Sequence, residues 1–247
     1  MTSMPDDKAG AIEHGHKPTA MTIEDPALAA EAKQATDAEQ QMTLWRAVKL
    51  YPHAIGWSML LSSTLIMEGY DLALLGSLYA SDAFNERFGT YSESSGKFLV
   101  SAGWQSALSN GARAGEILGL ILAGWTSDRF GYKYTTAGSL VLMIAFVFVL
   151  FFAPNVQVLV VGEVLCGIPW GAFQSVTPAY ASEVAPVVLR PYLTTFINMC
   201  WVIGQFFAAA VNKGSVNRTD EWAYKIPFGV QWVWPIPILI GVLFAPE

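Results

Sequence analysis

Charged residues and cysteines are scarce in this sequence. Only 14% of its 247 residues are Asp, Glu, Lys or Arg, whereas 53% are hydrophobic, a balance that soluble domains of this size do not have. The formal net charge is −6, the opposite sign to that of a nucleic-acid-binding surface. Two cysteines, Cys166 and Cys200, are too few for a disulfide framework or a zinc cluster, so we expect them to be packing residues. The composition therefore predicts a membrane protein with no nucleic-acid partner.

Catalytic motifs are lacking as well. The sequence contains no HExxH motif, no nucleophile elbow, and no paired cysteine or histidine ligand set. Its histidines, His14, His16 and His53, lie in or near the N-terminal segment. We therefore expect neither an enzyme nor a bound metal or cofactor.

Residues 1–45 have the composition of a disordered cytoplasmic tail. Small and polar residues dominate, three prolines are present, and large apolar side chains form no cluster, so nothing there offsets the entropy of folding. The segment also lacks the basic region, short apolar core and cleavage site of a secretory signal. We expect the first membrane helix to act as an uncleaved anchor.

Beyond this tail, long apolar stretches make up a predicted membrane domain, residues 46–247. A spanning helix needs about 20 mostly apolar residues, and runs of 19 to 29 residues without charge recur here. With two further stretches that contain charge, they predict an all-α bundle of six transmembrane helices. The predicted helices cover residues 53–79, 98–126, 134–153, 157–182, 190–212 and 226–245. Short connections make neighbours antiparallel, and an even number places both ends of the chain on one side.

The flanking charges do not fix the orientation of this bundle. Lys and Arg near the spans number five on each side, so the positive-inside rule gives a tie. Asn217-Arg218-Thr219 is an N-glycosylation sequon between the fifth and sixth predicted helices. If it is used, that loop is outside and both termini are cytoplasmic; such tripeptides also occur by chance.

Four carboxylic acids lie within the predicted spans: Glu68, Asp71, Glu116 and Glu163. A charge in hydrocarbon costs at least about 2.5 kcal/mol on insertion scales, so an acid there normally faces a wet cavity or a partner. An ion pair with Arg113 would account for one of these acids at most. Desolvation favours proton binding by the others, which a proton-coupled pump or symporter requires.

Amide side chains within the spans are candidate sugar contacts. Asn198 and Gln205 are seven residues apart and share one helix face. Gln105 belongs to a polar stripe of the second predicted helix, and Gln231 stands beside Trp232. Amides both donate and accept hydrogen bonds, which suits a polyol. Interhelical hydrogen bonding is an equally open alternative, and tryptophans such as Trp232 are more typical of interface anchors.

Several motifs resemble those of the major facilitator superfamily. Gly-Trp-Thr-Ser-Asp-Arg-Phe-Gly-Tyr-Lys at 124–133 is similar to the signature between its second and third helices, with Tyr132 in place of a basic residue. Pro-Ala-Tyr-Ala-Ser-Glu-Val-Ala-Pro-Val-Val-Leu-Arg at 178–190 resembles the sugar-porter pattern that ends the fourth helix. Glu-Gly-Tyr-Asp at 68–71 resembles the aromatic-Gly-Tyr-Asp of the first helix. The chain after residue 50 is thereby identified as a member of the sugar porter family.

Other segments resemble fungal maltose and other α-glucoside:proton symporters. In Gly-Glu-Val-Leu-Cys-Gly-Ile-Pro-Trp-Gly at 162–171, Glu163 stands where many hexose porters have Arg. The segments 189–195, 200–205 and 231–237 resemble the same branch. Pro191 stands where the family usually has Gly, and proline removes a donor from the local turn.

The resemblance implies a role for each candidate residue. The proton-coupling acids would be Asp71, Glu68, Glu116 and Glu163. The residues that contact sugar hydroxyls would be Asn198, Gln205, Gln105 and Gln231. A charge network that latches one conformation would consist of Asp128, Arg129, Lys133, Glu183 and Arg190. The implied function is symport of an α-glucoside such as maltose, or of another sugar, with protons. The implied location is the plasma membrane, with both termini cytoplasmic.

The length matches one of the two six-helix halves of such transporters. We therefore expect the N-terminal half only, truncated and inactive alone because the other half of the sugar site is absent. Two alternatives stay open. One is a half-size carrier that self-associates through the face left by the missing half, and its dimer should survive mild detergent. The other is a non-transporting regulatory or interaction protein of the membrane, which should depress uptake when expressed beside a full-length symporter.

Overall fold

The computed structural model describes residues 43–93, 96–215, 218 and 220–244, all within the unit Glu39–Glu247. The predicted tail up to residue 42 lies outside the described residues, and so does Asn217 of the sequon. The described part is mostly helical. Its helices are α2 (Leu44–Leu50), α3 (Pro52–Ser62), α4 (Leu65–Leu78), α5 (Asp82–Phe88), α6 (Ala102–Phe151), α7 (Val156–Val184), α8 (Arg190–Ser215), α9 (Trp222–Val230), the 3-10 helix η1 (Gln231–Val233) and α10 (Pro235–Phe244).

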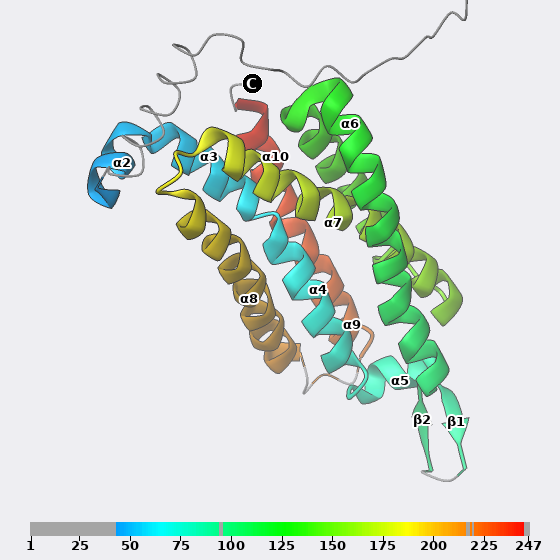
Figure 1. Ribbon diagram of the computed structural model, residues 1–247. Coiled ribbons are helices and arrows are strands. Elements are labelled where there is room, and N and C mark those ends of the chain that lie inside the picture. Colours follow the sequence, from blue (N-terminus) through cyan, green and yellow to red (C-terminus); the bar gives the residue numbers. More distant parts are fainter. Residues whose placement is uncertain (1–42, 94–95, 216–217, 219, 245–247) are drawn as a thin grey trace, which may run out of the picture. The chain divides into compact units, whose positions relative to one another are not determined.

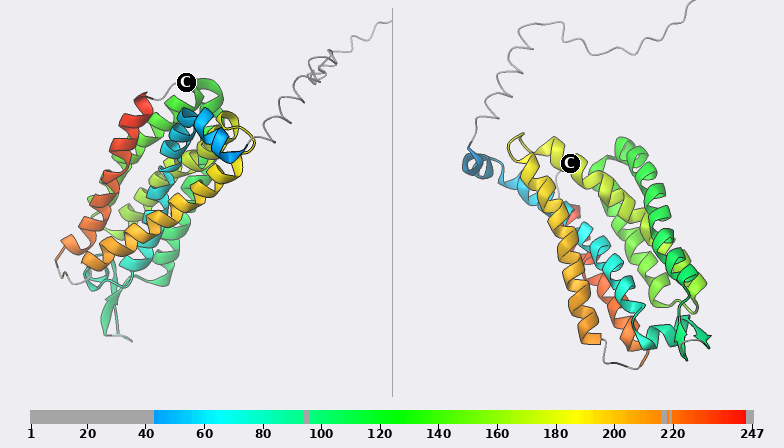
Figure 2. Two further views of the ribbon diagram at one scale, coloured as in Figure 1. Left: turned by 90° about the vertical axis from the view of Figure 1, so that its left-hand side faces the viewer. Right: turned by 60° about the horizontal axis from the view of Figure 1, so that its bottom comes forward.

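The helices form a bundle whose ends are easily told apart (Figure 1). One end holds α2 and the bend of α6, and the opposite end holds α5 with the strands β1 (Thr90–Ser92) and β2 (Lys97–Leu99). Within the bundle the most extensive packing joins α6 to α7 and α4 to α8. Figure 2 shows these elements from two further sides. In the described part, four helical segments are long and apolar enough to cross a membrane: Ala102–Phe151, Val156–Val184, Arg190–Ser215 and Trp222–Phe244.

The predicted helix 53–79 is interrupted in the structure. α3 ends and α4 begins around Ser63 and Thr64, whose hydroxyls donate to the carbonyls of Leu60 at 2.5 Å and of Leu61 at 2.7 Å. Such bonds compete with the backbone ladder of a helix and bend it. The interruption explains why neither piece alone has the length of a membrane span.

Two predicted helices, 98–126 and 134–153, lie within the single element α6. Gly131 interrupts it with φ 80° and ψ 168°, a left-handed conformation that glycine adopts at no steric cost. Residues on both sides of this bend stay helical. We call Ala102–Phe130 and Tyr132–Phe151 the first and second arms of α6.

The start of the predicted helix at residue 98 is wrong, and the all-α prediction omitted a hairpin. Lys97–Leu99 form β2, which pairs with β1 in antiparallel register, Tyr91 opposite Phe98. Asn85 accepts a hydrogen bond from the Val100 backbone N–H at 3.1 Å, which holds the chain extended before α6 begins.

The remaining predicted helices correspond to observed ones with changed ends. The ranges 157–182 and 190–212 correspond to α7 and α8, and the range 226–245 corresponds to the run α9–η1–α10. That run tightens to a 3-10 turn just before Pro235, because proline provides no N–H for the α-helical ladder.

Glycines allow two helix pairs to approach closely. A Cβ at Gly115 would lie 2.1 Å from the carbonyl oxygen of Val164, which joins α6 to α7. A Cβ at Gly69 would lie 2.1 Å from the carbonyl oxygen of Trp201, and one at Gly204 would lie 2.1 Å from that of Ile66. Small residues at such contacts are how membrane helices pack backbone to backbone. The α4–α8 contact places Glu68, next to Gly69, beside Trp201.

Candidate functional site

Glu68 is the centre of a polar cluster on α4. Its side chain is only 3% exposed, and its Oε1 lies 3.6 Å from Arg113 Nη1 of α6. The same Arg113 nitrogen lies 2.7 Å from Glu116 Oε2. Arg113 therefore shares its single positive charge between two acids, whereas the sequence suggested a pairing with one at most. Its side chain is 48% exposed, which leaves part of the guanidinium open to solvent.

Gln174 of α7 completes this cluster. Its Nε2 donates a hydrogen bond to Glu68 Oε1 at 2.8 Å, and Trp201 of α8 also interacts with the Glu68 carboxylate. The sequence reasoning did not single out Gln174. A signal was present, because Gln174 follows Glu163 by eleven residues, three helical turns, and so shares its face.

A cavity of about 410 Å³ opens beside Glu68. It lies between α4, α7 and α8 and is lined by Leu65, Glu68, Gln174, Ile197, Asn198 and Trp201. Asn198 is the one predicted sugar contact among these lining residues, and its Nδ2 donates to the carbonyl of Thr194 at 3.4 Å. A carboxylate, two amides and an indole can accept from hydroxyls, donate to them, and stack on the apolar face of a pyranose ring.

A second pair of acids lies deeper in the bundle. Asp71 of α4 and Glu163 of α7 are fully buried, and their carboxyl groups interact with each other. Gln231 of η1 donates to Asp71 Oδ1. Asp71 Oδ2 and both Glu163 oxygens have no hydrogen-bond partner of good geometry. Two adjacent carboxylates repel when both are ionised, so one bound proton relieves the pair.

A hydrogen bond from the residue next to Asp71 helps to hold this second pair in place. Tyr70, the neighbour of Asp71, donates its hydroxyl to the carbonyl of Pro227 at 2.8 Å. This bond ties α4 to α9, four residues before Gln231. Asp71 therefore has an acid beside it, Glu163, at the position where the sequence resemblance implies Arg in many hexose porters.

The structure does not bring all predicted sugar contacts to the cavity. Gln105 donates to the carbonyl of Val100 at 2.8 Å, at the start of α6 near the hairpin. Gln231 is buried against Asp71. Gln205 is partly buried on α8, directly after Gly204. Among the four, Asn198 alone lines the cavity next to Glu68.

The predicted charge network lies at the α2 end of the bundle. Asp128, Arg129 and Lys133 surround the α6 bend, and Glu183 and Arg190 lie at the facing ends of α7 and α8. No ion pair joins these five in the part of the chain that the structure describes.

Other contacts occupy several members of this set. The Tyr132 hydroxyl donates to Glu183 at 2.6 Å, Arg190 Nε donates to the carbonyl of Ala185 at 3.1 Å, and the Arg129 guanidinium lies 5.8 Å from the Trp125 ring. Tyr132, which stands where the motif has a basic residue, thus adds a side-chain hydrogen bond between α6 and α7 near the bend.

Apolar helices of membrane-spanning length, with buried acids beside a polar cavity, define an integral membrane protein of the transporter class. The chain belongs to the family described as "Sugar (and other) transporter", which matches residues 57–247. This confirms the family predicted from the sequence motifs.

Two curated relatives from Saccharomyces cerevisiae are similar over most of the chain. The maltose permease MAL31 is 45% identical and the alpha-glucosides permease MPH3 is 46% identical, each over 219 residues. Each alignment covers 88% of this chain and 36% of the relative. The chain therefore spans little more than a third of the length of these relatives.

A solved structure shares the fold. The proton:xylose symporter XylE of the major facilitator superfamily, bound to 6-bromo-6-deoxy-D-glucose, superposes with a TM-score of 0.67. The likeness covers 81% of this chain and 46% of that chain at 22% sequence identity.

Proposed function

We propose that this chain takes part in the proton-coupled transport of an α-glucoside, such as maltose, across the plasma membrane. The observation that carries the proposal is the buried Glu68, hydrogen-bonded to Gln174 and opening onto the cavity that Asn198 lines. The 45% identity to a maltose permease supports this substrate class. The alignment covers 36% of that relative, so the activity belongs to the whole transporter.

In this proposal the cavity binds part of the sugar. Glu68 accepts a hydrogen bond from a sugar hydroxyl, and Asn198 and Gln174 donate and accept at neighbouring hydroxyls. Trp201 provides an apolar ring face for the pyranose. Glu68 Oε2 is buried and has no hydrogen-bond partner in the described part of the chain, which is costly, so a sugar without a hydroxyl to donate to it binds more weakly.

Asp71 and Glu163 form the proton site in the same proposal. A proton bound by either carboxyl removes the repulsion between them, and Gln231 holds Asp71 in place. Glu68 and Asp71 are three residues apart on α4, neighbouring positions on one helix face. A movement of α4 therefore acts on the proton site and on the sugar cavity together.

We propose six membrane crossings, with α3–α4 as one crossing and the two arms of α6 as two. The α2 end of the bundle, where Arg129, Lys133 and Arg190 lie, is the cytoplasmic side in this proposal, as the family resemblance implies, because the flanking positive charges themselves give a tie. Both ends of the described part fall on that side (Figure 1).

A chimera tests the proposed function. The 219-residue segment of MAL31 that matches this chain is replaced by the corresponding segment of this chain, and maltose uptake is measured in a host without maltose transporters. We expect uptake that increases with an inward proton gradient. The same chimera with Glu68→Gln and Asn198→Ala should lose it while reaching the membrane in equal amount. A chimera that reaches the membrane and transports another solute class but no α-glucoside would refute the proposal.

A further inference from the structure

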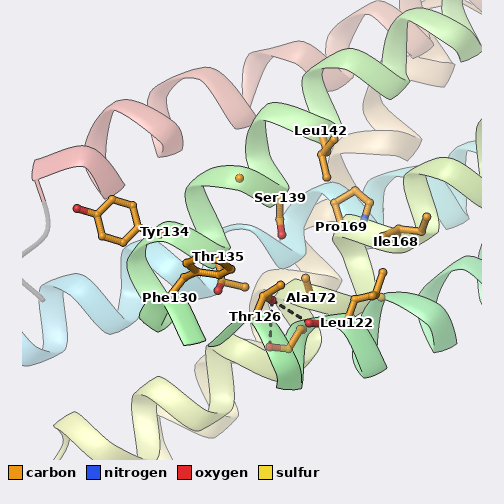
Figure 3. A pocket seen from close by; sticks show the side chains of 13 residues that line it. Leu122, Thr126, Phe130, Tyr134, Thr135, Ser139, Leu142, Ile168, Pro169 and Ala172 are labelled. Atoms are coloured by element: carbon orange, nitrogen blue, oxygen red, sulfur yellow. Dashed lines mark hydrogen bonds between the residues drawn. The ribbon is translucent and has the colours of Figure 1, made fainter. Parts of the chain in front are cut away.

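A second cavity lies between the two arms of α6 and α7 (Figure 3), and its α6 lining comes from residues 119–130 and 134–142, on both sides of the bend. Its volume is about 300 Å³. Leu122 and Phe130 line it from the first arm, Thr135, Ser139 and Leu142 from the second arm, and Ile168 from α7. None of these residues belongs to the proposed sugar or proton site. We call this cavity the arm groove.

The arm groove opens at the surface of the bundle. Leu122 is 50% exposed and Phe130 is 54% exposed. Both belong to a helix whose length and apolar composition suit a membrane span, so lipid is the medium that this groove would meet in a bilayer. An apolar groove open to lipid takes its ligand from the bilayer.

The groove contains a buried hydroxyl without a partner. Thr135 is 7% exposed, lines the groove, and its Oγ1 has no hydrogen-bond partner. By contrast, Thr126 on the facing arm donates to the carbonyl of Leu122 at 2.8 Å. Because an unsatisfied buried hydroxyl is destabilising, a ligand that offers an acceptor oxygen to Thr135 is favoured.

Charged, polar and apolar residues follow one order from the α6 bend along α6, with the two cations beside the lining residues Phe130 and Tyr134 and not themselves in the lining. Arg129 and Lys133 flank the α6 bend, and Thr135 comes four residues after Gly131. Leu142 lies seven residues further, about 10 Å along the helix. Two acids also lie near the bend: Asp128 of α6, and Glu183 of α7, which accepts a hydrogen bond from the Tyr132 hydroxyl.

This order of cation, hydroxyl and hydrocarbon matches the phosphate, ester carbonyl and acyl chain of a glycerophospholipid. The anionic phosphate complements Arg129 and Lys133. We propose that the arm groove binds one acyl chain of a glycerophospholipid, with the ester carbonyl accepting a hydrogen bond from Thr135. Such a lipid wedges between the arms of α6 and stabilises the bend.

Gly138 allows the groove to be filled without disturbing the fold. It lines the groove, and a Cβ placed there meets nothing within 4 Å. Gly138→Leu therefore points a side chain into the groove. Gly76 of α4 is equally open and lies outside the groove, so Gly76→Leu is the matched control, with the same gain in helix propensity.

The experiment uses the full 247-residue chain in phosphatidylcholine vesicles that contain a phosphatidylcholine with a diazirine on its acyl chain. After illumination, mass spectrometry measures the labelling of peptides around Leu122 and Leu142 against the exposed face around Ile240, itself 55% exposed. We expect the groove peptides to be labelled in excess. This excess should disappear in Gly138→Leu, persist in Gly76→Leu, and fall in Thr135→Val, which keeps the shape of the side chain.

Three results would overturn the proposal. The first is groove labelling no higher than that of the Ile240 face. The second is an excess that Gly138→Leu leaves unchanged. The third is preferential labelling by a photoactivatable sterol that added phosphatidylcholine does not reduce, which would assign the groove to a sterol. Labelling unchanged by Thr135→Val would overturn the assigned hydrogen bond.

Discussion

Gln174 Nε2 lies 2.8 Å from Glu68 Oε1 although 106 residues separate them along the chain. This contact joins α7 to α4 at the edge of the cavity that Asn198 lines. Arg113 reaches the same Glu68 oxygen from α6. Three helices thus hold one buried carboxylate in a fixed position next to a space of about 410 Å³.

Replacing Gln174 by Leu in the chimera should weaken maltose transport. The change removes a hydrogen bond to a charged group, worth about 1.5–3 kcal/mol, so we expect the KM for maltose to rise by about tenfold or more. Initial rates of labelled maltose uptake measure it. Gln157→Leu is the control, because Gln157 is exposed near the start of the same helix. Equal KM values for the two variants would remove Gln174 from the sugar site.

Proton coupling should depend on the Asp71–Glu163 pair. We expect Asp71→Asn to abolish accumulation of sugar against its gradient while downhill exchange survives. The reason is that the amide of Asn binds no proton at physiological pH. Glu163→Gln should have the same effect if the two carboxyls share the proton. Uptake with an imposed pH gradient, compared with exchange at equal pH, separates the two activities. Glu86→Gln, at an exposed site on α5, is the control; full accumulation in Asp71→Asn would contradict the assignment.

The sequence predicted those helices that are encoded by a continuous stretch of apolar residues. Uncharged runs delimited α7 and α8 to within a few residues, because few structures other than a helix tolerate such runs in a bilayer. The break at Ser63 was not predictable in this way, since hydroxyls within an apolar helix either bond back to the backbone or face a neighbour. The predicted break between residues 126 and 134 coincides with the α6 bend, but the structure confines the non-helical conformation to Gly131 and keeps its neighbours helical.

Site residues were harder to predict because their partners come from other helices. Glu68, Asp71 and Glu163 stood out as charges in apolar runs, but the packing of α4 against α7 decides that Asp71 meets Glu163. Gln105 was grouped with the sugar contacts, yet its amide bonds to Val100, next to a hairpin that the apolar pattern did not indicate. Gln174 carries no charge, so only its helical register with Glu163 could have identified it.

The backbone contact between α4 and α8 should tolerate no side chain at Gly204. A Cβ there would lie 2.1 Å from the carbonyl oxygen of Ile66, so Gly204→Ala forces the helices apart at a cost of about 1–3 kcal/mol. Gly214 lies on the same helix with nothing within 4 Å of its Cβ position, and Gly214→Ala should stabilise by about 0.5–1 kcal/mol. Thermal unfolding of the two variants in one detergent should shift the apparent Tm in opposite directions. A Tm for Gly204→Ala at or above that of the unsubstituted protein would show that the α4–α8 contact is looser than described.

Arg113 should matter for stability through the two acids that it pairs with. In Arg113→Leu, Glu68 and Glu116 remain buried without their cation, and breaking such a pair costs about 3–5 kcal/mol when both partners are fully buried. The half-exposed Arg113 side chain reduces this figure, so we expect a lower Tm and a smaller monodisperse fraction in detergent rather than complete unfolding.

Removing the negative charges of Glu68 and Glu116 as well should reverse the loss of Tm. The triple variant with Arg113→Leu, Glu68→Gln and Glu116→Gln should recover most of the Tm, because each amide is neutral and keeps the shape of its acid. A triple variant less stable than Arg113→Leu would mean that Arg113 acts through packing of its aliphatic stem and not through charge.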